Sequence, residues 1–223
     1  MMSVSSTDRG LLTPDNGVLM FIDHQAATLS CLASVERKTV LDNVVILAKA
    51  ATIFGLPAIV TAIKAPGFDG NIAGQLSEVL RETAPITRTS MNAWDSEEVV
   101  AAVRSTGRRN LIMAALWSEA CLAMPALQAL TDGYGVYAVE NASAGTSPRA
   151  HATAIRRIEQ AGGVSLTALQ LLLELQRDCA WSEHYDEVMA VLAAVCHAPD
   201  KQPEHSAVKL RTTLKREAAR KQR

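Results

Sequence analysis

Short apolar runs alternate along this chain with longer stretches in which apolar residues recur every three or four positions. The short runs predict buried strands over residues 18–22, 58–61, around 86, 111–116, 136–139 and 164–166. The longer stretches predict helices over residues 38–54, 72–80, 95–107, from near 121 to 132, 148–161, 168–178 and 182–197. This order implies right-handed crossovers and a three-layer α/β/α sandwich around a mainly parallel, Rossmann-like sheet of six strands.

Capping and helix-breaking residues define two of these helix boundaries. Gly55 is the expected C-cap of the helix over residues 38–54, and Pro57 prevents its continuation. Asp95 has the character of an N-cap, with Glu98 three residues later as in a capping box. Trp94 then has two interpretations, either as the hydrophobic staple of that helix or as part of a pocket lining.

Composition is that of a globular protein with an aliphatic core. The chain has 223 residues, 48% hydrophobic and 20% charged but only 4% aromatic, which suits one domain over residues 8–198. No apolar run approaches the roughly 18–20 residues that span a bilayer. The first residues lack the basic-then-apolar order of a signal peptide, so we expect a cytoplasmic protein without membrane association.

Charge is distributed unevenly. Residues 199–223 hold eight Lys and Arg against three Asp and Glu, which leaves fourteen basic against twenty acidic residues elsewhere. Such a basic C-terminal extension can bind nucleic acid or an anionic surface. It lacks interleaved aromatic residues and any nucleic-acid-binding signature, so we expect a solvated extension and no nucleic-acid partner.

Cys121 stands where a predicted strand gives way to a helix. Backbone N–H groups and the helix dipole favour a thiolate at such a position, and the same N–H groups can stabilise an oxyanion. Cys31, Cys179 and Cys196 show neither metal-site nor disulfide-framework spacing, and we interpret them as ordinary thiols.

Two more chemically useful residues follow predicted strands. Asp23 ends the first strand, and Arg88 follows the third. Because carboxyl ends of parallel strands share one edge of a sheet, we expect Asp23, Arg88 and Cys121 to converge in one crevice. Burial would raise the pKa of Asp23 into a range useful for a base.

In order and spacing, these segments resemble the isochorismatase-like cysteine hydrolases, most closely the YcaC-like branch, from about residue 11 to about residue 198. The resemblance implies a catalytic Asp23, Arg88 and Cys121, with arginine at the position usually held by lysine. It also implies a cis peptide at Trp117–Ser118 and oxyanion donors near Trp117 and Cys121. Relatives have a small aliphatic residue at position 117, so the indole would narrow the pocket.

Other residues near these segments are candidates for contact with a substrate. Gln25 follows the base closely and is either a substrate contact or a support for one. Asn92 and Trp94 lie beyond Arg88 and are further candidates. His24 is the residue next to Asp23, and we interpret it as a structural histidine.

No metal or other cofactor is expected. Related nicotinamidases hold their ion with an Asp-x-His motif and a further histidine after the second strand, where this chain offers Asp69 but no histidine. The resemblance also implies a homo-oligomer, a tetramer or an octamer, for which the C-terminal helices are our candidate contact surface.

The sequence therefore predicts a hydrolase that cleaves a small amide or carbamoyl C–N bond through a Cys121 thioester. Asp23 would act as acid and base and Arg88 as its electrostatic partner. An ester or nitrile substrate is the alternative within the same chemistry. A non-enzymatic scaffold or thiol-oxidation sensor is the alternative outside it, because a reactive thiol suits both roles.

Overall fold

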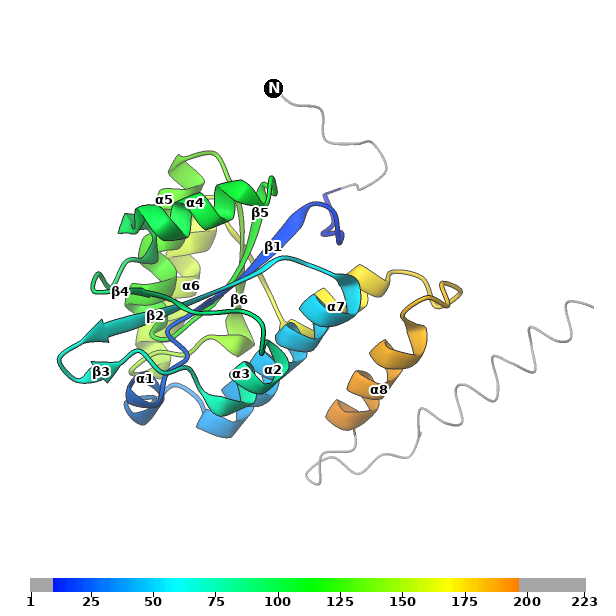
Figure 1. The fold of residues 1–223 in the computed structure, drawn as a ribbon, viewed down its shortest axis with the longest axis horizontal. Coiled ribbons are helices and arrows are strands. Elements are labelled where there is room, and N and C mark those ends of the chain that lie inside the picture. Colours follow the sequence, from blue (N-terminus) through cyan, green and yellow to red (C-terminus); the bar gives the residue numbers. More distant parts are fainter. Residues whose placement is uncertain (1–9, 197–223) are drawn as a thin grey trace, which may run out of the picture. The chain divides into compact units, whose positions relative to one another are not determined.

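A computed structural model describes residues 10–196 of the chain, which falls into one compact unit ending at Arg177 and a second beginning at Asp178. The first unit is built around a seven-stranded, mainly parallel sheet, confirming the predicted α/β class (Figure 1). Its strands are β1 Gly17–Ile22, β2 Ala58–Ala65, β3 Phe68–Asp69, β4 Ile86–Arg88, β5 Asn110–Ala115, β6 Gly135–Val139 and β7 Val164–Leu166.

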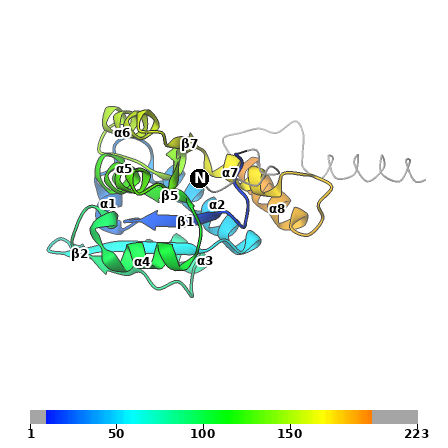
Figure 2. The same ribbon diagram turned by 90° about the horizontal axis from the view of Figure 1, so that it is seen from above.

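Strand β1 lies inside the sheet, between β2 and β5, and pairs in parallel with both. Beyond β2 the sheet continues with β4, and beyond β5 it continues with β6 and β7, all parallel. The two-residue β3 pairs antiparallel with the end of β2. Figure 2 shows β1 and β2 running side by side. The order of strands reverses between β1 and β5, which is the switch point where doubly wound sheets bind ligands.

The helices of the first unit are α1 Ala26–Ser30, α2 Arg37–Phe54, α3 Gly74–Val79, α4 Glu97–Ser105, α5 Ala123–Thr131, α6 Pro148–Gln160 and α7 Ala168–Gln176. Residues of α4, α5 and α6 share one apolar core with alternate side chains of β1 and β5. Helix α2 packs against α3 and α7 on the other side of the sheet (Figure 1).

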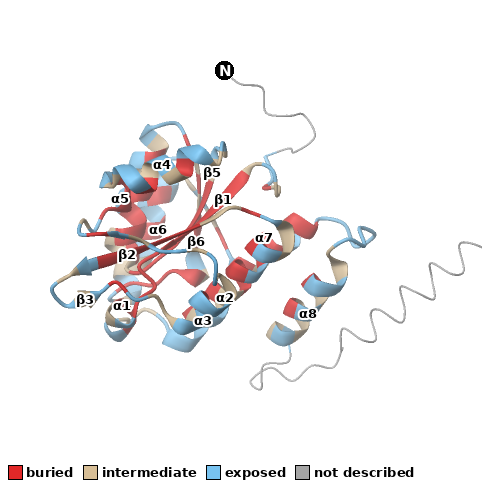
Figure 3. Ribbon diagram, viewed as in Figure 1, coloured by how far each residue is buried: buried red, intermediate tan, exposed pale blue. Residues whose placement is uncertain are grey.

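Local sequence explains the main elements. Every residue of β1 is buried, as a parallel strand covered on both faces requires, and the neighbouring strands β2 and β5 are buried over most of their length (Figure 3). Helix α2 ends at Gly55, whose φ of 64° lies in the left-handed region. The predicted cap is thereby confirmed.

Short elements depart from the prediction. The sequence analysis missed α1 and β3, which have five and two residues. Its assignment of Asp95 as the cap of α4 was wrong: Ser96 accepts from the Val99 N–H, and Asp95 closes a preceding 3₁₀ turn, Ala93–Asp95. Ser96 has the extended backbone of an N-cap residue, and its Oγ reaches the Val99 N–H.

The second unit contains helix α8, Tyr185–Cys196. Within the described part of the chain, no helix combines the length and apolar character needed to cross a bilayer. The basic segment 199–223 and the outer limits of the predicted domain lie outside the described residues.

Candidate active site

The three predicted catalytic residues lie at the carboxyl ends of three strands. Asp23 follows β1, Arg88 is the last residue of β4, and Cys121 follows β5. All three are buried, with 0%, 7% and 2% of their surfaces exposed. Arg88 Nη2 donates to Asp23 Oδ2 at 2.6 Å, and Asp23 in turn interacts with the Cys121 thiol. The expected convergence of a carboxylate, a cation and a thiol is present.

Backbone contacts hold Asp23 in an unusual conformation. Its φ of 58° is in the left-handed region, which a residue with a Cβ adopts at a cost. The N–H of Asp23 donates to the Thr61 carbonyl at 3.0 Å, and its own carbonyl accepts from Thr28 Oγ1 at 2.6 Å. These bonds from β2 and α1 fix the turn that directs the carboxylate toward Arg88.

Arg88 is held at several points. Besides Asp23, its guanidinium donates from Nη1 to the Ser90 carbonyl and from Nη2 to Thr61 Oγ1 at 3.4 Å. Its Nε is buried and has no hydrogen-bond partner among the described residues, and the same holds for Asp23 Oδ1.

Cys121 lies in a π-helical turn, Ser118–Leu122, that precedes α5. Cys121 thus lies in the first helical turn after β5, as predicted, although this turn is π-helical. The predicted preference for a thiolate was wrong. Burial raises the pKa of the Cys121 thiol, and the negative charge of Asp23 raises it further. The backbone N–H of Trp117 and the charge of Arg88 oppose these effects without overcoming them. Burial and the Asp23 charge both favour the protonated thiol over the thiolate.

The pKa of Asp23 is raised, as the sequence analysis expected. Burial is the main cause, while the Arg88 charge and the contact with Cys121 work in the opposite direction. A carboxylate of raised basicity beside a protonated thiol is suited to accept the thiol proton.

The turn between β5 and α5 is braced by the segment after β6. The cis peptide bond joins Leu116 and Trp117, so its prediction at Trp117–Ser118 was wrong by one residue. Leu116 still bridges to Ala144 in parallel, and the chain turns directly after it. The Ser118 N–H donates to the Ala144 carbonyl at 2.9 Å, and Ser118 Oγ lies 2.7 Å from His151 Nδ1.

The three predicted substrate contacts use their polar atoms internally. Gln25 bonds the backbone of Ile63 twice, from Nε2 to its carbonyl at 3.0 Å and from its N–H to Oε1 at 2.9 Å. Asn92 caps the 3₁₀ turn and donates to Gln128 Oε1 at 2.5 Å. Trp94 donates from Nε1 to Asp132 Oδ2 at 2.8 Å. Their role as substrate contacts therefore stays a prediction.

His24 also has a structural role, as predicted. The fully buried ring makes its hydrogen bond from Nε2 to the Ala142 carbonyl at 3.0 Å. Burial lowers the pKa of His24 to about 4, so the ring is neutral at pH 7. Nδ1 has no partner among the described residues.

Four supporting residues could not be identified from the sequence: Thr28, Thr61, Ala144 and His151. Their contacts run through backbone atoms or join segments far apart in the chain. One local signal was available for Thr28, which stands three residues after Gln25 and forms a reciprocal cap with it.

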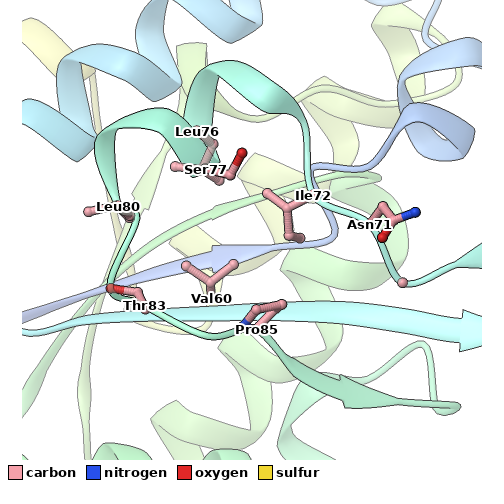
Figure 4. Close-up of a pocket in the computed structure, with 9 residues that line it drawn as sticks. Val60, Asn71, Ile72, Leu76, Ser77, Leu80, Thr83 and Pro85 are labelled. Carbon is pink, nitrogen blue, oxygen red and sulfur yellow. The ribbon is translucent and has the colours of Figure 1, made fainter.

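A separate surface cavity of about 380 Å³ lies between α3 and the β2–β4 edge of the sheet. Figure 4 shows its mainly apolar lining, with Ile72, Leu76 and Leu80 on one side and Val60 and Pro85 on the other. None of the three catalytic candidates lines it. Within residues 10–196, no group of three or more His, Cys, Asp or Glu side chains gathers in a way that could hold a metal ion.

Comparison with known families and sequences gives a consistent result. Residues 18–170 match the model of the isochorismatase domain. The probable hydrolase YcaC of Escherichia coli K12 is 33% identical over 190 residues, which cover 85% of this chain and 89% of YcaC.

Solved structures agree with the sequence relationship. YcaC from Pseudomonas aeruginosa, determined with hexane-2,5-diol and covalent acrylamide, superposes with a TM-score of 0.77 at 31% identity. The match covers 86% of this chain and 93% of that one. The Escherichia coli YcaC structure, described as an octameric hydrolase of unknown specificity, gives a TM-score of 0.73 at 30% identity over 84% of this chain and 97% of that one.

Proposed function

Because the chain belongs to the isochorismatase family and is YcaC-like, we propose that it is a cysteine hydrolase that cleaves a small amide or carbamoyl C–N bond. The single observation that carries this proposal is the buried contact of Asp23 with both Arg88 and Cys121. It joins a nucleophile, a base and a fixed positive charge in one site.

The first step of the proposed reaction is attack by Sγ of Cys121 on the substrate carbonyl carbon. As the S–C bond forms, the thiol proton passes to Asp23, whose raised pKa makes it a competent base. Arg88 remains charged throughout and cannot shuttle a proton. Its role is to hold the carboxylate in place and to limit how far burial raises the pKa of Asp23.

Collapse of the tetrahedral intermediate breaks the C–N bond. The nitrogen leaves with the proton that Asp23 received, and a thioester remains on Cys121. Asp23 is then a carboxylate again and can take a proton from the water that hydrolyses the thioester. The unpartnered Oδ1 atom of Asp23 suits it to both transfers.

Backbone N–H groups supply the charge stabilisation in this scheme. The N–H of Trp117 acts on the Cys121 sulfur, and we assign it and the Cys121 N–H as donors to the developing oxyanion. The Ser118 N–H is not a donor in this arrangement, because it bonds the Ala144 carbonyl.

The substrate is a small molecule, the location is cytoplasmic, and no cofactor takes part. The octamer described for Escherichia coli YcaC supports a homo-oligomer here as well, with α8 as the candidate contact surface.

Intact-mass spectrometry on the full chain tests the chemistry. Wild type and the Cys121→Ala variant are incubated with matched panels of small carboxamides, carbamoyl compounds and esters. We expect an acyl adduct on wild type alone that decays as the acid product accumulates. An adduct and product with esters but not amides would reject C–N cleavage.

An Asp23→Asn variant separates an enzyme from a thiol sensor. A hydrolase loses turnover in this variant, while oxidation of Cys121 by peroxide continues. If no compound in the panel gives an adduct or a product and wild-type Cys121 is still readily oxidised, the sensor interpretation replaces the hydrolase.

A further inference from the structure

The Trp117 side chain bridges the two segments that carry the base and the nucleophile. Trp117 follows β5, and its indole Nε1 donates to the Thr28 carbonyl in α1 at 3.0 Å. Thr28 also donates to the Asp23 carbonyl, and the Trp117 N–H acts on the Cys121 sulfur. One residue thus contacts both the segment after β1 and the segment after β5.

The position of this bridge matters because β1 and β5 are neighbouring strands. Ile22 pairs with Ala115 at their carboxyl ends, and the strand order reverses between them. In doubly wound sheets the crevice outside this point is where a ligand enters. The bridge therefore lies where a substrate has to reach Cys121, of which only 2% is exposed.

We propose that Trp117 sets the upper size of the group that a substrate carries at its reacting carbon. The indole ring forms a wall beside the approach to Cys121. Because its hydrogen bond to Thr28 fixes the ring, the side chain does not rotate away as freely as one without such a bond. A compact acyl or carbamoyl group reaches the sulfur beside it, whereas an aryl or branched group meets the ring. The proposal rests on the proposed function for its substrate class, but not for its test.

Alkylation of Cys121 tests the wall without requiring a known substrate. Acrylamide and cinnamamide, which carries a phenyl ring on the carbon that is attacked, react with a thiol by the same step: the S–C bond forms at the alkene carbon β to the carbonyl, the C=C π bond breaks, and the thiol proton ends on the α carbon. Rates at Cys121 are followed by peptide mass mapping, because Cys31, Cys179 and Cys196 are exposed and also react. Each rate is divided by the rate at which glutathione reacts with the same compound, which corrects for the intrinsic reactivity of the two compounds.

Wild type should favour acrylamide over the phenyl compound by at least about tenfold, the scale on which a pocket separates groups by size. Trp117→Val should largely abolish this preference. Trp117→Phe keeps a ring but loses the bond to Thr28, and should fall between the two. Trp181→Phe, at a tryptophan 53% exposed in the second unit, should match wild type.

Equal preference in wild type and Trp117→Val would overturn the proposal, as would an equal change in Trp181→Phe. Circular dichroism of each variant confirms folding, and Trp117→Phe supplies the test if Trp117→Val does not fold. A preference that disappears in Trp117→Val while no amide is hydrolysed would reject the proposed function and leave the wall in place.

Discussion

Arg88 Nη2 and Asp23 Oδ2 lie 2.6 Å apart, with their side chains 4% and 0% exposed. An ion pair so thoroughly removed from water contributes little net stability, because desolvation offsets the attraction. The pair orients the Asp23 carboxylate, and the Arg88 charge opposes the rise in the pKa of Asp23 that burial causes. Loss of either partner leaves the other as an unpaired buried charge.

Replacing Arg88 by Met should therefore destabilise the protein by about 3–5 kcal/mol at neutral pH. The pKa of Asp23 should rise further, since the charge that opposes burial is gone. The native state then binds a proton more readily than the unfolded chain, so the difference from wild type should shrink as pH falls. Urea denaturation at pH 7 and pH 5 measures both effects.

Arg88→Lys is the matched control for charge. Lysine restores a cation but cannot donate to Asp23 and to the Ser90 carbonyl in the same geometry. We expect it to recover most of the stability and less of the activity. Equal loss of stability in both variants would show that packing, and not charge, is what Arg88 supplies.

Asp23→Asn should change the pH profile of Cys121 alkylation in two ways. Removal of the base lowers the rate near neutral pH. Removal of the negative charge lowers the pKa of the thiol relative to wild type, so the rise in rate toward alkaline pH begins earlier. Acrylamide labelling between pH 6 and 10, mapped to the Cys121 peptide, measures both.

The control for this profile is Asp42→Asn, which removes an exposed carboxylate paired with Lys38. Because exposed pairs act weakly, the profile should stay that of wild type. A Cys121 rate that responds equally to both substitutions would contradict the assignment of Asp23 as the base.

Gly145→Ala should disturb the contacts between the segment after β6 and the turn that carries Cys121. An added Cβ would lie 2.5 Å from Glu119 Oε2 and 3.1 Å from the His151 backbone nitrogen. Glu119 has little freedom to move, since its Oε1 accepts from Thr146 N–H and Oγ1. We expect a loss of about 1–3 kcal/mol, as for overpacking elsewhere, and slower labelling of Cys121.

Gly74→Ala provides the comparison, because an added Cβ there meets no atom within 4 Å and the residue begins α3. It should be neutral or stabilise by up to about 1 kcal/mol. Thermal unfolding of the two variants beside wild type distinguishes crowding at Gly145 from a general effect of losing a glycine.

The sequence predicted well that the three candidate residues cluster, because each of them follows or ends a strand. The ends of parallel strands share an edge, so the convergence of Asp23, Arg88 and Cys121 follows from topology alone. The charge state of Cys121 did not follow, since it depends on burial and on a carboxylate 98 positions away in the chain. Neither the burial of the thiol nor the position of that carboxylate can be inferred from a helix N-terminus alone.

The hydrogen-bond partners of Asn92 and Trp94 were harder to predict for a related reason. Asn92 and Trp94 were chosen by proximity in sequence, and their partners Gln128 and Asp132 are 36 and 38 positions away. The short helix α1 could not be predicted, because five residues are too few to show a helical periodicity. Yet α1 supplies Thr28, which supports Asp23 and receives the Trp117 indole.

His24 should make the protein sensitive to mild acid. Burial lowers the pKa of His24 from 6.5 to about 4. Between these two pH values, His24 is therefore protonated in the unfolded chain but neutral in the native state. Stability should therefore decline as pH falls from 6.5 to about 4, by up to roughly 3 kcal/mol for this residue. His24→Gln keeps a donor for the Ala142 carbonyl but does not titrate, while His151 and Asp23 remain in both proteins. Urea midpoints at pH 7, 5.5 and 4.5 should converge in the acid range, and parallel curves would contradict the role given to His24.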